Sequence, residues 1–283
     1  MTDLESAPPS QFAGGQPDRK EREEGSFLWF LVKLFVVVLI FRTFVFGMFS
    51  IPSESMLPTT LWGDYLFTEK WPYGYSRYSF LFGFPSFDGK ILARLPSRGD
   101  VVVFRHPTEN ADLIKRVIGL PGDTVEVRGG ALILNGKAVA REKLPPFAAP
   151  ISDKSPCKVA PGATPIVADA GHGPVCLYPA YRETLPGGPS YTVLDQVDGL
   201  PADDFPVVTV PAGHVFLMGD NRDDSLDSRF SPAERGIGMV PAENLIGRAT
   251  VTFWSTDGSA SYVLPWTWFS ALRGSRIGNG YSQ

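Results

Sequence analysis

The sequence predicts a mainly β protein that follows a single N-terminal transmembrane helix. A 22-residue apolar run extends from Phe27 to Met48. After residue 50, apolar residues recur in short alternating runs bounded by turn residues, with little helical periodicity. Glycine and proline are abundant, with 29 and 26 residues, which favours many turns between short strands.

Residues 1–26 precede the apolar run, and we expect them to be a disordered tail. They are polar, contain proline and glycine, and show no apolar periodicity. The run that follows is long enough for a bilayer, which needs about 20 mostly apolar residues. Its two charges, Lys33 and Arg42, lie toward its ends and can reach the headgroups. Because the apolar core of a cleavable signal peptide has only about 7–15 residues, we expect an uncleaved anchor.

The charges that flank the run predict its orientation. Basic residues gather just before it, in the segment Arg19–Arg22, whereas no lysine or arginine occurs from Thr43 to Glu69. Under the positive-inside rule, the tail stays in the cytoplasm and everything after residue 49 is exported.

The exported part is predicted to consist of short strands with only minor helix. Asn135 and Gly136 stand between two apolar runs, which is the signature of a two-residue hairpin. Residues 140–190 are rich in proline and glycine with weak patterning, which suggests an insertion between two halves of a core. We therefore expect a β core over residues 49–128 and 213–275, an inserted smaller β subdomain over 129–212, and a C-terminal tail over 276–283.

Composition argues against several function classes. The net charge of −4 disfavours a nucleic-acid partner, because such proteins usually carry a basic face. The chain has three histidines and two cysteines, with no HExxH or CxxC spacing, so we expect no metal and no cofactor. His106 and His214 resemble ordinary strand-edge histidines, although composition alone leaves a Ser-His-Asp triad open. Cys157 and Cys176 can form a disulfide in an exported domain, or remain free thiols.

Two serines stand one residue apart directly after the apolar run, in the stretch "SIPSESMLPTT". A serine is a poor nucleophile unless a base removes its proton. Taken alone, Ser53 and Ser55 therefore fit a turn with capping hydroxyls as well as they fit an active site.

Lys115 lies inside the apolar run "DLIKRVIG". Because side chains alternate along a strand, Lys115 and Arg116 should point to opposite faces. A lysine that faces an apolar pocket loses the solvation of its charged form, and its pKa falls toward the range of a general base. A surface lysine on an edge strand is the alternative.

The third segment whose side chains suit a functional site is "GDNRDDSLDSRF". It does not fit a calcium loop, because Ser228 stands where such a loop needs glycine and no helices flank it. We expect instead a buried polar network in which Asp220 pairs with Arg229 and Ser225 bonds another side chain.

Together, these segments resemble bacterial type I signal peptidases, the membrane-bound leader peptidases. The resemblance covers nearly all of residues 27–278. It rests on the anchor and on several motifs in the right order: "SIPSESMLPTTLWGDYLFTEK", "RGDVVVFRHP", "DLIKRVIGLPGD", "YRETLPGGPSY", "GDNRDDSLDSR", "NLIGRA" and "SALRGSRIG".

The resemblance implies that Ser55 is the nucleophile and Lys115 the general base of a Ser-Lys dyad. The hydroxyl of Ser53 and the backbone N–H of Ser55 would form the oxyanion hole. Ser225 would orient the lysine ammonium. The resemblance also implies scaffold roles for Asp220, Asp227 and Arg229, and substrate-binding roles for Phe49, Ile51 and Pro52.

The function implied is that of a membrane-anchored serine endopeptidase in the bacterial inner membrane, with its catalytic domain on the extracytoplasmic side. It would remove signal peptides from exported preproteins, preferring small residues at −1 and −3. The substrate would bind as an extended strand beside a sheet edge. The implied partners are preproteins and membrane lipid, with no metal, cofactor or nucleic acid.

The sequence departs from the family pattern in three ways. Glu54 replaces the usual glycine between the serines, although its side chain can still point outward. Thr60 stands where a leucine usually walls the pocket. The chain has one predicted span, whereas the family's better-known members often have two.

Two other classes of protein compete with this interpretation. Self-cleaving repressors use the same Ser-Lys chemistry, but they need a DNA-binding helical domain, and residues 1–50 offer none. A non-catalytic membrane-tethered chaperone or receptor would have no reason to desolvate Lys115. The pKa of that lysine therefore separates the second class from an enzyme.

Overall fold

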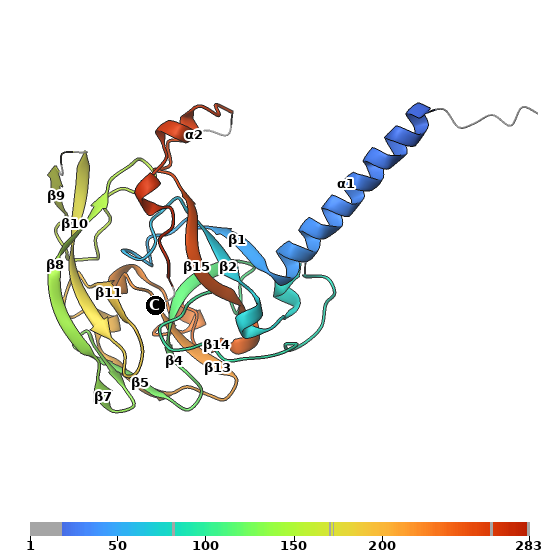
Figure 1. Ribbon diagram of the computed structural model, residues 1–283. Helices are drawn as coiled ribbons and strands as arrows, with labels where there is room; N and C mark the ends of the chain where they lie inside the picture. Colours follow the sequence, from blue (N-terminus) through green and yellow to red (C-terminus); the bar gives the residue numbers. More distant parts are fainter. Residues whose placement is uncertain (1–18, 81–82, 170, 172, 261–262, 282–283) are drawn as a thin grey trace, which may run out of the picture. The chain divides into compact units, whose positions relative to one another are not determined.

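The computed structural model describes residues 19–80, 83–169, 171, 173–260 and 263–281 (Figure 1). Most of the tail predicted to be disordered, residues 1–18, lies outside the described residues. The chain divides into two units, residues 1–41 and residues 42–283. All the described strands belong to the second unit, which confirms the mainly β prediction.

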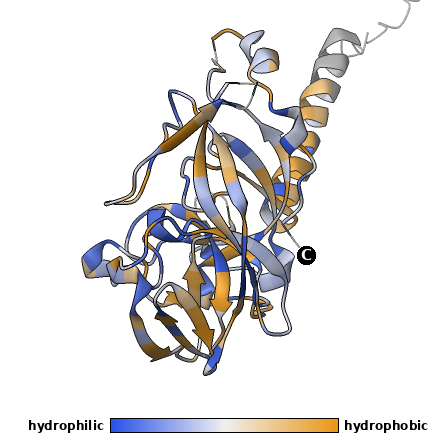
Figure 2. Ribbon diagram, turned by 90° about the vertical axis from the view of Figure 1, so that its left-hand side faces the viewer, coloured by the Kyte–Doolittle hydropathy of each residue, from blue (hydrophilic) through white to orange (hydrophobic). Residues whose placement is uncertain are grey.

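Helix α1, Arg19–Phe44, contains a stretch of 19 residues, Ser26–Phe44, that is long and apolar enough to cross a membrane. Its large apolar side chains are exposed on every side, with Phe35 at 65% and Val37 at 62%. Figure 2 shows the apolar colour over much of this helix. A helix without a polar face is suited to lipid rather than to water.

Both ends of α1 differ from the prediction. The helix begins at Arg19, inside the expected disordered tail, because the lysine, arginine and glutamate residues there have high helix propensity. It ends at Phe44, before the predicted end at Met48, because Phe46–Ser50 forms strand β1 instead. Strand β1 pairs with β2, and this ladder outweighs the propensity of an apolar run to continue as a helix.

Seven strands form one antiparallel sheet in the order β1-β2-β15-β3-β4-β13-β14. Apolar cores cover both faces of this sheet: Val103 and Ile114 belong to one, and Val102 and Val117 to the other. The strands are β1 (Phe46–Ser50), β2 (Asp64–Glu69), β3 (Val101–Arg105), β4 (Asp112–Gly119), β13 (His214–Met218), β14 (Val240–Pro241) and β15 (Leu245–Ser255).

Two four-stranded sheets lie between β4 and β13 in the sequence. One has the order β12-β5-β6-β7, and in the other β8 and β11 flank β10, with β9 also paired to β10. Their strands are β5 (Thr124–Arg128), β6 (Ala131–Leu134), β7 (Lys137–Ala138), β8 (Ala140–Pro150), β9 (Ile166–Asp169), β10 (Pro174–Thr184), β11 (Ser190–Leu194) and β12 (Phe205–Thr209).

The predicted hairpin at Asn135-Gly136 joins β6 to β7. Asn135 and Gly136 have φ angles of 52° and 73°, as the two central residues of a type I′ turn require.

The inserted segment is not packed as a separate body. Strand β5, which we expected in the core, pairs with β6 and β12 rather than with the seven-stranded sheet. An apolar cluster that includes Ile118, Leu132, Val193 and Phe216 draws residues from all three sheets. Residues 42–283 accordingly form one compact unit.

The C-terminal segment is partly built into the fold rather than forming a tail. Tyr281 is buried in the same core as Ile51 and Leu66, and its backbone N–H donates to the carbonyl of Thr250 in β15. The remaining described helices are short: α2 (Thr267–Ser270) and the 3₁₀ turns Trp71–Tyr73, Arg77–Ser79, Pro201–Asp203, Arg222–Asp224, Pro232–Glu234, Ala242–Asn244 and Gly274–Arg276.

Candidate active site

A loop between β1 and β2, which we call the serine loop (residues 51–63), carries both serines. Two hydrogen bonds close its base: Ile51 N–H donates to Asp64 O at 2.9 Å, and Gly63 N–H donates to Ile51 O at 3.0 Å. Within the loop, Leu57 N–H donates to Glu54 O at 3.0 Å and forms a tight turn around Ser55. Ser55 is 8% exposed, so its hydroxyl is buried beneath the surface.

Asn221 holds this turn from the segment that follows β13. Its backbone N–H donates to Ser55 O at 3.0 Å, and its side-chain amide donates to Glu54 O at 3.2 Å. No hydrogen bond in the described part of the chain uses the backbone N–H of Ser55. That N–H is therefore available to a ligand.

Lys115 reaches Ser55 from strand β4. The backbone ladder places Lys115 opposite Val102 of β3, in the interior of the sheet. Its Nζ donates to Ser55 Oγ at 2.5 Å, and the lysine is 4% exposed. Arg116 binds Asp220 and Gly99 instead, as the alternation of side chains along a strand predicts.

Burial lowers the pKa of Lys115 to about 8, although the carboxylates of Asp227, Asp224 and Asp220 act in the opposite direction. Burial also lowers the pKa of Lys70 and of Lys90 to about 8. These two lysines donate to backbone carbonyls, at 2.6 Å and 3.1 Å. A depressed pKa alone therefore does not identify a base, and the contact with a serine hydroxyl distinguishes Lys115.

Ser53 lies beside the nucleophile candidate, with its Oγ 3.4 Å from Ser55 Oγ. It is partly exposed, whereas Ser55 is buried. The hydroxyl of Ser53 and the unused N–H of Ser55 thus stand on the same short turn.

Ser225 is buried, and within the described residues its Oγ has no hydrogen-bond partner. The expected bond to Lys115 is not among the hydrogen bonds of the described chain. A Cβ at Gly219 would lie 2.3 Å from Ser225 Oγ and 2.5 Å from Ser55 O, so glycine lets both groups come close.

The expected ion pair between Asp220 and Arg229 is wrong. Arg116 makes a bidentate pair with Asp220, at 2.8 Å and 2.6 Å. Arg229 instead pairs with Asp227, with both contacts at 2.9 Å. Asp220 follows β13, which runs beside β4, so its nearest guanidinium is that of Arg116.

These two pairs hold the site in different ways. Thr59 of the serine loop donates to Asp220 at 2.5 Å, so Asp220 joins that loop to β4. Although burial acts to raise the pKa of Asp227, the neighbouring Arg229 and hydrogen bonds lower it below its usual range. The sequence analysis gave no site role to Thr59, Arg116 and Asn221, although each lies within one of the three motifs.

Glu54 does not adopt the outward conformation that the sequence allowed. It is 4% exposed, accepts a hydrogen bond from Ser155, and lies 3.6 Å from Lys158 Nζ.

Thr60 is fully buried, and within the described residues its Oγ1 has no hydrogen-bond partner.

The residues expected to bind substrate are only partly brought together. Ile51 and Pro52 line a cavity of about 700 Å³, together with Trp62, Tyr65 and Trp254. Phe49 does not line this cavity and packs instead against the core that contains Ile51 and Ile114.

Two histidines, His106 and His214, and both cysteines occupy structural positions, whereas His172 lies outside the described residues. His106 accepts hydrogen bonds from the backbone of Thr108 and Glu109, and His214 lies at the start of β13. Cys157 and Cys176 are joined by a disulfide, with Cα atoms 5.3 Å apart.

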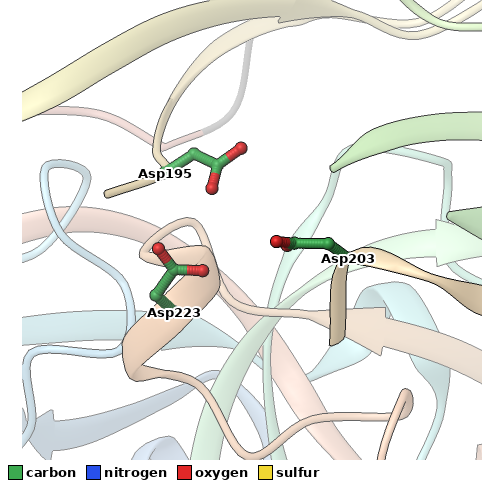
Figure 3. A group of neighbouring side chains, drawn as sticks. All are labelled: Asp195, Asp203 and Asp223. Atoms are coloured by element: carbon green, nitrogen blue, oxygen red, sulfur yellow. The ribbon is translucent and has the colours of Figure 1, made fainter. Parts of the chain in front are cut away.

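One group of three carboxylates in the described part of the chain could offer ligands to a cation: Asp195, Asp203 and Asp223 (Figure 3). Their oxygens lie within 4.8 Å of one another. Burial raises the pKa of Asp203 and of Asp223, and the neighbouring carboxylates add to the effect. Backbone N–H groups and Arg141 already occupy one oxygen of each carboxylate, so the cluster ties loops together, and it contains neither Ser55 nor Lys115.

The arrangement around Ser55 has the parts of a nucleophilic site. A hydroxyl lies in contact with a buried amine of lowered pKa, and hydrogen-bond donors stand beside it. A neutral amine at this position can accept the proton of Ser55 and make its oxygen a nucleophile. A serine hydrolase that used lysine as its base would need this arrangement.

Comparison with known proteins gives the family. A family model described as signal peptidase, peptidase S26, matches residues 25–254. The signal peptidase I of Rickettsia felis is 34% identical over 275 residues, which cover 91% of each chain. That of Rickettsia typhi is 34% identical over 259 residues, which cover 85% of this chain and 88% of the other. The chain therefore belongs to the signal peptidase family, peptidase S26.

Among solved structures, a signal peptidase I from Enterococcus faecalis is 24% identical with a TM-score of 0.29, and the match covers 55% of this chain and 97% of that one. Family membership makes this chain a membrane-associated serine peptidase of the signal peptidase I type, which cleaves signal peptides.

Proposed function

We propose that the chain removes signal peptides from exported preproteins by means of a Ser55–Lys115 dyad. The observation that carries this proposal is the 2.5 Å contact between Lys115 Nζ and Ser55 Oγ in a buried site. Neutral Lys115 accepts the proton of Ser55 as its oxygen attacks the carbonyl before the cut. The lysine then protonates the leaving amine of the mature protein. In the second step, neutral Lys115 takes a proton from water, which attacks the ester and releases the signal peptide from Ser55.

The substrate binds as an extended strand beside β1, with small residues at −1 and −3. In support of this binding mode, β1 is an edge of the seven-stranded sheet and leads directly into the serine loop. In an extended strand, the side chains at −1 and −3 point to the same face. Ile51 is buried at the start of the serine loop and, together with Pro52, lines the cavity that such side chains would enter.

The enzyme acts at the bacterial inner membrane as a single-pass protein, with its N-terminus in the cytoplasm and residues after 49 outside. Its partners are preproteins and membrane lipid, without metal, cofactor or nucleic acid. The charge asymmetry around the Ser26–Phe44 stretch supports this orientation, and the disulfide between Cys157 and Cys176 fits an oxidising compartment.

Protease added to intact spheroplasts is expected to degrade the β domain and spare the N-terminal tail, as separate tags on the two ends would show on a blot. The basic residues before the span are the reason for this orientation. Protection of the β domain until the spheroplasts are lysed would reverse it.

The value of kcat/KM is expected to rise with pH and level off above the pKa of Lys115, which is about 8. Below that pH the amine is protonated and cannot accept the serine proton, so activity falls about tenfold per pH unit. A flat profile between pH 6 and 10, with chemistry shown to be rate-limiting, would count against a lysine base.

Cleavage of a preprotein by the detergent-solubilised full chain tests the function directly. Mass spectrometry of both products gives the position of the cut. We expect one cut, after a small residue at −1 with another at −3. Cutting at scattered positions, or no processing of any preprotein, would contradict the proposed function.

A further inference from the structure

Glu54 stands between the two serines of the proposed site, yet its side chain binds a distant segment. We propose that Glu54 is a positioning residue that anchors the serine turn to the segment closed by the Cys157–Cys176 disulfide. Through this anchor, the disulfide keeps the hydroxyl of Ser55 in register with Lys115. This inference rests on the proposed roles of those two residues.

The carboxylate of Glu54 is almost completely withdrawn from solvent. Ser155 Oγ donates to its Oε1, and Lys158 Nζ lies 3.6 Å from its Oε2. Both partners come from the segment between β8 and β9, about a hundred residues further along the chain. Burial of a carboxyl group is unfavourable unless it has polar partners, and a glutamate in a turn can otherwise remain in water. The pairing therefore fixes the conformation of this turn.

The partner segment is itself held in place. Ser152 and Ser155 exchange backbone hydrogen bonds at 3.0 Å and 3.1 Å, which fixes the turn that presents Ser155. Tyr178 of β10 donates to Lys158 O at 2.7 Å. Cys157 lies in the sequence between Ser155 and Lys158, and the disulfide joins it to Cys176 of β10.

A second connection runs through the apolar core beneath the turn. Leu57 and Leu61 of the serine loop belong to the buried cluster that contains Cys176 and Tyr178, with Cys157 packed against it. The disulfide thus lies between the two attachments of the serine loop, one polar and one apolar. Its loss would loosen both.

Asn221, from the segment that follows β13, binds the carbonyls of Glu54 and Ser55. The turn is therefore clamped through its backbone by Asn221 and through its side chain by the disulfide segment. Removal of the side-chain clamp leaves the turn free to rotate about the remaining backbone bonds. A misplacement of about 1 Å can lower a rate by about 10²-fold.

The test measures kcat, KM and melting temperature of the full chain with a preprotein substrate. We expect Glu54→Ala to lower kcat about tenfold with KM within about twofold, because the displaced group acts in the chemical step. Glu54→Gln keeps an acceptor for Ser155 and should retain most of the activity. Ser155→Ala, which leaves the disulfide and the glutamate intact, should reproduce most of the loss.

A double-mutant cycle tests the connection to the disulfide. Replacing Cys157 and Cys176 with serine should lower kcat in the wild-type chain, and by a smaller factor in the Glu54→Ala background, where only the apolar attachment is left to loosen. The melting temperature should fall in both backgrounds, which separates stability from positioning. Glu142→Ala is the matched control, since Glu142 is exposed on β8 and pairs only with Arg182 among the described residues.

A wild-type value of kcat in Glu54→Ala would overturn the inference. It would also be overturned if kcat in the combined variant fell by the product of the two separate losses. Ser55→Ala in the same assay keeps this result separate from the proposed function. If Ser55→Ala is inactive and Glu54→Ala is fully active, only the positioning role is rejected. If Ser55→Ala is active, the proposed dyad fails and the inference falls with it.

Discussion

Replacement of Ser55 with alanine, or of Lys115 with methionine, will lower kcat for preprotein cleavage on the order of 10⁶-fold, as when a serine protease loses its nucleophile or base. Ser55 supplies the attacking oxygen, and Lys115 is the basic side chain that contacts it. Methionine fills much of the same space and removes a buried amine. We therefore expect both variants to fold and to insert into membranes.

Lys90→Met is the matched control for the lysine variant. Burial lowers the pKa of Lys90 to about 8 as well, but its Nζ donates to the carbonyl of Tyr73 rather than to a serine. Cleavage by Lys90→Met should stay near the wild-type rate. Normal processing by Ser55→Ala or Lys115→Met, with wild-type enzyme excluded from the preparation, would disprove the dyad.

Replacement of Ser53 with alanine will lower kcat by roughly 10²–10³-fold and change KM little. Negative charge gathers on the former carbonyl oxygen as the acyl intermediate forms, and donors already in place stabilise it. The N–H of Ser55 is one such donor. Ser53 Oγ, 3.4 Å from Ser55 Oγ and on the same turn, is the second.

Ser53→Thr distinguishes this role from a capping role, because threonine keeps the hydroxyl and adds one methyl group. The threonine variant should retain much of the activity. If Ser53 only stabilises the turn, alanine would cost about 1 kcal/mol of stability and leave kcat within a few fold. Measurement of kcat and melting temperature for both variants separates the two roles.

The sequence was informative where one local pattern determines the outcome. Alternating apolar runs predicted the β fold, and the Asn135-Gly136 pair predicted a hairpin that the structure contains. The position of Lys115 inside an apolar run left a buried lysine and a surface lysine as alternatives, and the structure has it buried against Ser55. Each of these features depends on neighbouring residues along one strand or turn.

Features that depend on which distant segments meet were not predictable in the same way. Both Arg116 and Arg229 were available to Asp220, and only the pairing of β13 with β4 decides between them. The helix ends at Phe44 because β2 is available to pair with Phe46–Ser50. Glu54 is buried because Ser155, far along the chain, folds back onto it.

The structure also bears on the competing classes of protein. A non-catalytic chaperone or receptor has no use for a buried lysine against a serine hydroxyl, and the pKa of Lys115 is lowered to about 8. The match over residues 25–254 assigns the chain to the signal peptidase family rather than to the self-cleaving repressors.

Trapping of the acyl-enzyme tests the central claim most directly. Excess full-length enzyme is mixed with a preprotein, quenched in acid at short times, and mapped by peptide mass spectrometry. If Ser55 is the nucleophile, the peptide that carries it gains the mass of the signal-peptide acyl group, which is that of the free signal peptide less one water. The adduct should be absent in Ser55→Ala and should not accumulate in Lys115→Met. An adduct on any other residue would contradict the account.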